Sequence, residues 1–381
     1  MVLLVNQLTI PVFADVANAL AKQGKPVTLF TGKVEESYTA LSPGITVVHA
    51  VAYRRGSLGS RFITWLLFTF HLMGYVLTKR GITHILVVTN PPLAPIVVSR
   101  LARWRKIPYS VLVYDLYPEA LSQAGVSSER NWIFKQWQKI NPSVFNNAHG
   151  LITLSESMKA ALAPYVANPE RIRIIPNWVE TSYIRPVPKN ENPFLARHGL
   201  HGKLVVLYSG NMGMTHDLES LLEAATILKG RTEICFVLIG EGAKRNKLLA
   251  MKESGHLENV LFLPYQSAQD FPFAMAAGDI GVVTLGVGAE GISVPSKTYV
   301  NMAAGLCLLT IAPKVSELNR IVETYACGYI CEPHHPADIV SFLMTMTTDK
   351  EQLQRYRENA RKASFHFGSE NANQYVDVVK D

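Results

Sequence analysis

The chain has 381 residues, of which 48% are hydrophobic and 18% are charged. This composition excludes an intrinsically disordered chain, and the length exceeds that of one typical core, so we expect two domains. The net charge of +7 is unevenly spread: residues 1–185 carry 19 Lys and Arg against 9 Asp and Glu, whereas residues 186–381 carry 18 against 21. A basic first half predicts an anionic partner. Nucleic-acid stacking motifs and arginine-rich tails are not evident, so a membrane surface is favoured over nucleic acid.

The four cysteines suggest either a metal site or ordinary reduced thiols. Cys327 and Cys331 are close together and are followed by His334 and His335, a spacing that would suit zinc. Cys331, however, falls in an apolar run that predicts a strand, and a strand would separate the ligands. We therefore expect no metal and reduced cysteines. The N-terminus shows no basic leader with a small-residue cleavage site, so we expect a cytoplasmic location.

The first half alternates predicted strands and helices, the pattern of a parallel sheet. Predicted strands cover 1–6, 27–30, 47–48, 85–89, 109–114, 150–154 and 172–175, and predicted helices cover 13–23, 96–104 and 132–144, with Ser155 as the cap of a further helix. The stretch from Arg61 to Arg80 differs, because seventeen residues without formal charge lie between Arg61 and Lys79. It is interpreted as a buried crossover helix, as an interfacial helix that contacts lipid, or as a short membrane span.

Two carboxylates follow the strand that ends near Tyr114. Asp115 and Glu119 lie just past its carboxyl end, where open α/β sheets bind their ligands. The alternative is that they cap the next helix. Residues 180–200 are rich in Pro, Asn and charge and form the predicted linker.

The second half restarts the pattern. Predicted strands cover 204–208, 235–239, 260–263, 280–285 and 306–310, predicted helices begin near 218 and 270, and residues 336–363 are helical with charges that look solvated. The first strand leads into the glycine turn 209–213 and then a helix, an arrangement that presents backbone N–H groups to phosphate. After the strand 280–285, a glycine-rich run with Glu290 leads into a helix that we expect Ser296 to cap. Lys297 in its first turn opposes the helix dipole unless an anion lies beside it.

The order of motifs is more specific than any one motif. The relevant segments are S-G-N-M-G at 209–213, H-D-L-E-S-L-L-E-A-A at 216–225, I-G-E-G at 239–242, N-V-L-F-L-P-Y at 259–265, A-G-D-I-G-V-V-T-L at 277–285, S-V-P-S-K-T-Y-V-N-M-A-A-G at 293–305, Y-D-L-Y-P-E at 114–119 and I-P-N-W-V-E at 175–180. Together they resemble the family-4 retaining glycosyltransferases of the GT-B fold, in the V-P-S-K subgroup that builds bacterial surface polysaccharides and lipid-linked oligosaccharides.

This resemblance implies an α/β fold of two Rossmann-like parallel-sheet domains facing across a cleft. Residues 1–185 would bind the acceptor, residues 200–363 the nucleotide sugar, and residues 364–381 would dock back on the first domain. It implies a hexosyltransferase-type enzyme in which Lys297 neutralises the diphosphate leaving group, Glu290 holds sugar hydroxyls and Asp115 is the polar catalytic group of the first domain. The donor contacts would come from Gly210, Asn211, Gly213, Glu241 and Ser296.

The resemblance further implies a UDP- or GDP-sugar as donor substrate, no cofactor and no metal. The acceptor would be lipid-linked or a glycan, at the inner face of the plasma membrane. Four departures keep alternatives open. Val300 stands where the family has a ribose-binding glutamate, and only Asn211 and His216 lie near the positions where many relatives have an Arg and a Lys on the phosphates. The usual glycine-rich loop after the first strand is replaced by residues around Gln7, and Tyr114 stands where other members have a histidine. The alternatives are a catalytically weak paralogue that binds a nucleotide or a partner, and a nucleotide-sugar epimerase.

Overall fold

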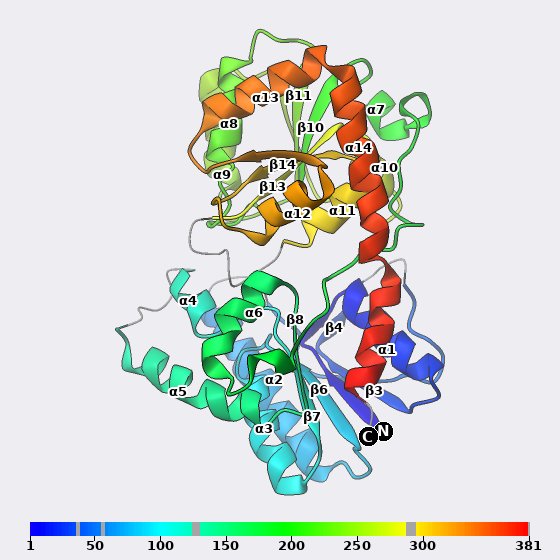
Figure 1. Cartoon of the computed structure of the whole chain (residues 1–381), viewed down its shortest axis with the longest axis vertical. Helices are drawn as coiled ribbons and strands as arrows, with labels where there is room; N and C mark the ends of the chain where they lie inside the picture. The colour runs from blue at the N-terminus through cyan, green and yellow to red at the C-terminus, as the bar shows by residue number, and fades with distance from the viewer. Residues whose placement is uncertain (36–38, 55–57, 124–129, 287–294, 380–381) are drawn as a thin grey trace. The chain divides into compact units, whose positions relative to one another are not determined.

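The computed structural model describes all residues except 36–38, 55–57, 124–129, 287–294 and 380–381. The described residues form two compact units, one of residues 1–177 and 369–379 and the other of residues 178–286 and 295–368. Each unit is built on a parallel sheet (Figure 1). This is the α/β architecture that the alternation of strands and helices predicts.

The first unit is centred on a seven-stranded sheet in the order β5-β3-β1-β6-β7-β8-β9. Its strands are β1 (Val2–Val5), β3 (Val27–Thr31), β5 (Thr46–His49), β6 (His84–Val88), β7 (Tyr109–Leu112), β8 (Gly150–Thr153) and β9 (Ile172–Ile174). In the centre, Leu4 is in register with Leu29 on one side and Leu86 on the other. The chain order reverses between β1 and β6, so the carboxyl ends of these two strands mark the switch point at which such sheets bind ligands.

The helices of the first unit are α1 (Pro11–Lys22), α2 (Leu58–Thr78), α3 (Ala94–Arg105), α4 (Glu119–Gln123), α5 (Trp132–Asn146), α6 (Glu156–Leu162) and α15 (Gln374–Val378). The last of these, α15, packs against α1 although almost the whole chain separates them (Figure 1). The predicted cap of α6 is confirmed, because Ser155 Oγ accepts a hydrogen bond from the N–H of Met158 at 3.2 Å.

Helix α2 corresponds to the uncharged stretch that begins near Arg61. Its inner side is buried, and the ring of Phe68 lies edge-on to Phe30 of β3 with centroids 5.3 Å apart. Its outer side exposes Phe62, Ile63 and Phe70 by 54%, 57% and 61%. By length and composition it is the one helix among the described residues that could cross a membrane, a test that core helices of soluble proteins also pass. Its packing on β3 makes it a crossover helix of the α/β unit with an exposed apolar side.

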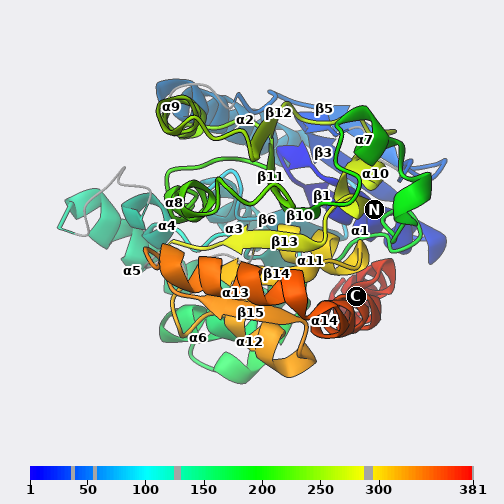
Figure 2. The same cartoon turned by 90° about the horizontal axis from the view of Figure 1, so that it is seen from above.

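The second unit contains a six-stranded parallel sheet in the order β12-β11-β10-β13-β14-β15, which Figure 2 shows from above. Its strands are β10 (Leu204–Ser209), β11 (Ile234–Ile239), β12 (Val260–Leu263), β13 (Ile280–Thr284), β14 (Cys307–Ile311) and β15 (Gly328–Cys331). Its helices are α7 (Pro193–Arg197), α8 (Glu219–Ile227), α9 (Arg245–Gly255), α10 (Phe271–Ala276), α11 (Lys297–Ala303), α12 (Glu317–Tyr325), α13 (Pro336–Thr348) and α14 (Lys350–Ser364). Helix α8 packs with α13, and α11 packs with α14.

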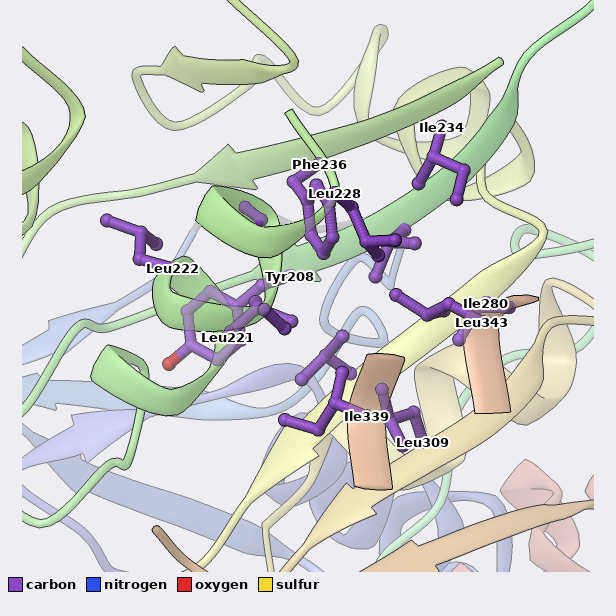
Figure 3. Packing of buried hydrophobic residues seen from close by; sticks show 14 of the residues in the cluster. Tyr208, Leu221, Leu222, Leu228, Ile234, Phe236, Ile280, Leu309, Ile339 and Leu343 are labelled. Carbon is purple, nitrogen blue, oxygen red and sulfur yellow. The ribbon is translucent and has the colours of Figure 1, made fainter. Parts of the chain in front are cut away.

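The core of the second unit fills the space between sheet and helices with apolar side chains. Phe236 and Ile280 from the strands meet Leu221 of α8 and Leu343 of α13 (Figure 3). The expectation that all charges of residues 336–363 are solvated is wrong. Arg357 of α14 reaches inward, with its guanidinium 3.2 Å from the buried carboxylate of Asp279.

Candidate functional site

The switch point of the second sheet gathers the residues that the sequence singled out in this half. Strands β10 and β13 are neighbours, and the chain order reverses between them. The glycine turn 209–213 follows β10, and α11 begins at Lys297 after the segment that follows β13. Their carboxyl ends therefore bring the turn and the start of α11 together, as the fold rule for ligand sites predicts.

Lys297 lies across this switch point. Its ammonium nitrogen donates a hydrogen bond to the hydroxyl of Tyr208 at 2.9 Å and sits 4.7 Å from the centre of that ring, within cation–π distance. Its side chain passes so close to Gly210 that a Cβ there would lie 2.3 Å from Lys297 Cε. Burial lowers the pKa of Lys297 from 10.5 to about 8. The backbone conformation of Gly210 (φ +138°) favours glycine at this position, and the lysine charge is held in a poorly solvated place.

Tyr208 connects Lys297 to the glycine turn, and the sequence reading missed it. Its ring belongs to the apolar core, with the hydroxyl oxygen at the edge of the cluster (Figure 3). The hydroxyl lies 2.5 Å from the carbonyl oxygen of Asn211, to which it donates, and 3.0 Å from Nδ1 of His216. Burial, and then the charge of Lys297, lower the pKa of His216 to about 4, so its imidazole is neutral at neutral pH. The sequence signal was weak: Tyr208 has a polar tip near the carboxyl end of an apolar strand, and only the contact with α11 gives its hydroxyl a role.

The turn after β10 is packed directly on the turn after β11. A Cβ at Gly240 would lie 2.1 Å from the carbonyl oxygen of Gly210, so only glycine fits there. The N–H of Gly210 donates to Ile239 O at 2.8 Å, and the N–H of Met212 donates to Glu241 O at 2.7 Å. These two N–H groups are therefore already bonded, and the expectation that the turn presents them to phosphate is wrong for both.

The other predicted donor contacts have mixed outcomes. Asn211 and Gly213 lie in the turn, with Gly213 N–H 3.4 Å from Nδ1 of His216. The carboxylate of Glu241 is exposed and lies 3.4 Å from Nε of Arg245.

The cap predicted at Ser296 is wrong: its dihedrals are already helical (φ −61°, ψ −20°), and its side chain makes no capping hydrogen bond. A capping serine needs extended dihedrals to reach back to the N–H groups of the first turn. Glu290 lies outside the described residues.

A second lysine, Lys244, contacts the segment that follows the glycine turn 209–213. Lys244 Nζ donates to the carbonyl oxygen of His216 at 2.7 Å and lies 2.8 Å from the carboxylate of Glu219, which also binds Lys247 at 2.9 Å. Burial acts to raise the pKa of Glu219, but the hydrogen bonds from Lys244 and Lys247 outweigh it and lower the pKa to about 2. The two lysines share one carboxylate, and Lys244 fixes the position of the His216 backbone.

Asp115 lies in the first unit, at the carboxyl end of β7. Its backbone N–H and that of Tyr114 both donate to the hydroxyl of Thr89, at 3.2 and 3.1 Å, which anchors the turn to the end of β6. Burial raises the pKa of Asp115 from 3.8 to about 6, although part of the residue reaches solvent. Glu119 instead begins α4 and accepts hydrogen bonds from Gln138 and Tyr165. Of the two predicted carboxylates, Asp115 is the one without a structural ion pair or cap among the contacts described.

The structure places the cysteines in the core. All four are buried free thiols, and Sγ of Cys331 lies 3.5 Å from the carbonyl oxygen of His335. Within the described part of the chain, no group of three or more His, Cys, Asp or Glu side chains is arranged as a metal site.

Comparisons with known proteins agree with this arrangement. Residues 192–363 match the family model of glycosyl transferases group 1, and residues 10–178 match that of the glycosyl transferase 4-like domain. The chain thus matches one glycosyltransferase family model in each half of its sequence. The fold is GT-B, because the chain resembles HepE of Anabaena, solved in complex with UDP and glucose, with a TM-score of 0.75 at 17% identity over 99% of this chain and 98% of that one.

Two curated relatives match parts of this chain. The probable glycosyltransferase WbjE of Pseudomonas aeruginosa is 27% identical over 255 residues, which are 67% of this chain and 64% of that protein. The putative colanic acid biosynthesis glycosyl transferase WcaI of Escherichia coli K12 is 30% identical over 203 residues, which are 52% of this chain and 49% of that protein. The matches thus span less than two thirds of the length of either relative.

Proposed function

We propose that this chain transfers a sugar from a UDP- or GDP-sugar to a lipid-linked or glycan acceptor in polysaccharide biosynthesis, with retention and without a metal ion. The proposal also places it in the V-P-S-K subgroup. The observation that carries it is the partly buried Lys297, held against Tyr208 and Gly210 at the switch point of the second sheet. A diphosphate leaving group develops negative charge as its bond to the sugar breaks, and a positive group held in a poorly solvated place stabilises it strongly.

The neighbouring side chains support this role for Lys297. His216 is neutral at neutral pH, and Lys244 is paired with Glu219. Asn211 and Gly213 lie in the same turn, where they would line the phosphates. Asp115, at the carboxyl end of the first sheet, would bind a hydroxyl of the acceptor or donor sugar. The raised pKa of its carboxyl group, about 6, suits proton exchange near neutral pH.

A donor screen tests the proposal. The melting temperature is measured with UDP, GDP and their sugars. One nucleotide class should raise it, because a ligand that binds only the folded state raises the free energy of unfolding. Lys297→Ala should remove this stabilisation. Absence of stabilisation by every nucleotide would reject the proposal.

Val300 favours a second candidate function, that of a catalytically weak paralogue. It lies in α11 and has no atom that could accept a hydrogen bond from a ribose hydroxyl. To separate the two functions, sugar transfer is measured in a single turnover from the nucleotide sugar that stabilises the protein. Nucleotide binding without any sugar transfer, even with a mixture of lipid-linked and glycan acceptors, would identify a binding protein.

We further propose that the first unit binds the anionic inner face of the plasma membrane. The exposed side of α2 is apolar, and the neighbouring α3 carries Trp104, which is 73% exposed. Basic residues lie in or directly after these two helices: Arg61, Lys79, Arg80, Arg100, Arg103, Arg105 and Lys106. Arg105 also donates to the carbonyl oxygen of Lys79 at 2.7 Å, which joins the end of α3 to the end of α2. Apolar contact plus attraction to anionic lipid is the usual basis of interfacial binding.

Flotation with phosphatidylglycerol vesicles tests this localisation. The wild type should float with the vesicles at low salt, and Phe70→Ser should float less. A wild type that stays in the bottom fraction contradicts the membrane proposal and leaves the transferase proposal intact.

A further inference from the structure

Four aromatic side chains form a row in the first unit, which we call the aromatic row: Tyr53, Trp65, Tyr117 and Trp137. Tyr53 stacks on Trp65 with centroids 6.3 Å apart and planes 5° apart, Trp65 meets Tyr117 edge-on at 6.5 Å, and Tyr117 stacks on Trp137 at 6.1 Å. The residues come from four separate segments, and all four are only partly buried. A row built from distant segments and still open to solvent needs an explanation beyond core packing.

Opposite charges flank the aromatic row. Burial raises the pKa of Tyr117, the nearby carboxylate of Asp115 and the hydroxyl of Tyr53 raise it further, and the guanidinium of Arg61 acts in the opposite direction. Both Asp115 and Arg61 are therefore close enough to act on the Tyr117 hydroxyl. A carboxylate accepts hydrogen bonds from hydroxyl groups, and a guanidinium binds phosphate, so the two charged groups near Tyr117 offer different chemistry to a ligand.

Buried polar atoms without partners lie at the same edge of the sheet. Nε1 of Trp65 is a buried donor, and Oε1 of Gln7 a buried acceptor, with no hydrogen-bond partner in the part of the chain that the structure describes. Gln7 is 1% exposed and is fixed at this place, because its Nε2 donates to the carbonyl oxygens of Thr64 at 3.0 Å and Val51 at 3.1 Å. Buried polar atoms are nearly always satisfied in proteins, and exceptions are concentrated where a ligand or water completes the bonding.

Helix α2 connects the aromatic row to the exposed apolar surface. It joins the carboxyl end of β5 to the amino end of β6, so its first turns lie at the carboxyl edge of the sheet. Arg61 and Trp65 are one turn apart on the inner side of these turns. Phe62 and Ile63, which directly follow Arg61, are more than half exposed. One short segment thus carries a cation, an exposed apolar surface and an aromatic ring.

We propose that the aromatic row binds the sugar of an acceptor that is joined through phosphate to a long hydrocarbon chain. The sugar lies against Trp65 and Tyr117 with a hydroxyl on Asp115, the phosphate lies at Arg61, and the chain follows Phe62 and Ile63. This deepens, and rests on, the proposed transfer reaction, because it selects the lipid-linked class over a free glycan. A free glycan would make no use of the cation and the apolar surface beside the row.

Calorimetric titration of the full chain tests the acceptor site without any sugar transfer. The probe is N-acetylglucosamine linked by diphosphate to farnesol, and the comparison ligand is N-acetylglucosamine 1-phosphate. The farnesyl probe should bind the wild type at least tenfold more tightly than the comparison ligand. Trp65→Ala and Phe62→Ser should each weaken the farnesyl probe at least tenfold, and Trp65→Phe should weaken it less. Trp132→Ala is the matched control, a tryptophan of the same unit that is 71% exposed and lies outside the row, and should change the affinity by less than twofold.

Thermal stabilisation by UDP, measured on the same variants, keeps the two proposals separate. UDP should stabilise all variants equally, which also shows that they are folded. Equal weakening by Trp65→Ala and Trp132→Ala, equal binding of the two sugar ligands, or no binding of the farnesyl probe to the wild type would overturn the acceptor site. Farnesyl-probe binding with no response to any nucleotide would instead overturn the transfer reaction and leave the binding site standing.

Discussion

At the level of single residues, Lys297 carries a charge that its surroundings disfavour. Burial lowers its pKa from 10.5 to about 8, so the folded protein holds this proton less firmly than the unfolded chain. This cost to stability is complete below pH 8 and disappears as the pH rises toward 10.5. Lys297→Met should therefore raise the free energy of unfolding at pH 7 by about 1–3 kcal/mol, and the gain should vanish near pH 10.5. Chemical denaturation across this pH range measures it.

The same substitution should remove stabilisation by nucleotide diphosphate, although the protein itself becomes more stable. In the wild type, affinity for the nucleotide should fall above pH 8, as the ammonium loses its proton. A control is Lys247→Met, which removes an exposed lysine from the same sheet end and should leave nucleotide affinity unchanged within about twofold. A variant Lys297→Met that is less stable than the wild type at pH 7 would contradict this interpretation.

Burial also disfavours the charged form of Asp115, which is an acid. Its pKa is raised by burial from 3.8 to about 6, so its contribution to stability is present below pH 3.8 and is lost as the pH rises through 6. Asp115→Asn should be more stable than the wild type by about 1–2 kcal/mol at pH 8, after allowance for partial solvent exposure, and equal to it near pH 4. Its sugar-transfer rate should fall about a hundredfold. Equal stability at pH 8 would show that the carboxyl group is not desolvated.

Sequence reasoning found the charged residues of the site but not the geometry that holds them. Lys297 and Asp115 were predictable because a lysine at a helix start and an acid after a strand are local patterns. Tyr208 was missed because its ring is ordinary core material, and its hydroxyl gains meaning only where β10 meets α11 in space. The capping prediction for Ser296 failed for a similar reason, since residue type does not determine whether the backbone is already helical at that position.

At the level of elements, the second unit is tied together by the buried carboxylate of Asp279. It binds Lys189 of the linker at 2.6 Å, Arg357 of α14 at 3.2 Å and the backbone N–H of Val205 in β10 at 2.9 Å. Asp279→Ala leaves two cations and a buried N–H without their acceptor, so we expect a loss of about 3–5 kcal/mol in the free energy of unfolding. Urea denaturation followed by circular dichroism measures it.

A matched control is the more exposed pair of Asp270 and Arg197, whose atoms are 3.2 Å apart. Asp270→Ala should cost no more than about 1 kcal/mol. Similar losses for the two variants would show that burial does not strengthen the Asp279 cluster.

The elements themselves were largely predictable, because hydrophobic periodicity is local. The strand predicted at 260–263 has the same bounds as β12, and most other predicted boundaries differ from the observed ones by one or two residues. The solvated charges predicted for residues 336–363 were wrong at Arg357, because its partner Asp279 lies 78 residues away in the chain. A pattern on one helix contains no information about a partner that distant.

At the level of the whole molecule, the chain begins and ends in the first unit. Residues 369–379 return after α14 and place α15 against α1, with Tyr375 fully buried. Lys25, which follows α1, donates from Nζ to the carbonyl oxygen of Val379 at 2.8 Å and fastens this end of the chain. The C-terminal segment thus completes the core of a unit whose sheet is formed by the opening half of the sequence.

Tyr375→Ala should therefore destabilise the first unit selectively. Removal of a buried aromatic ring costs about 3–5 kcal/mol, and the effect should appear as faster hydrogen exchange in α1, β1 and β3. Gln374→Ala, at the exposed neighbouring position, should change exchange little. Exchange in β10 and β11 should be unchanged in both variants, because α15 contributes no core to the second unit. Faster exchange in both sheets would mean that the two units unfold together, and stability would then be a property of the whole chain rather than of each unit.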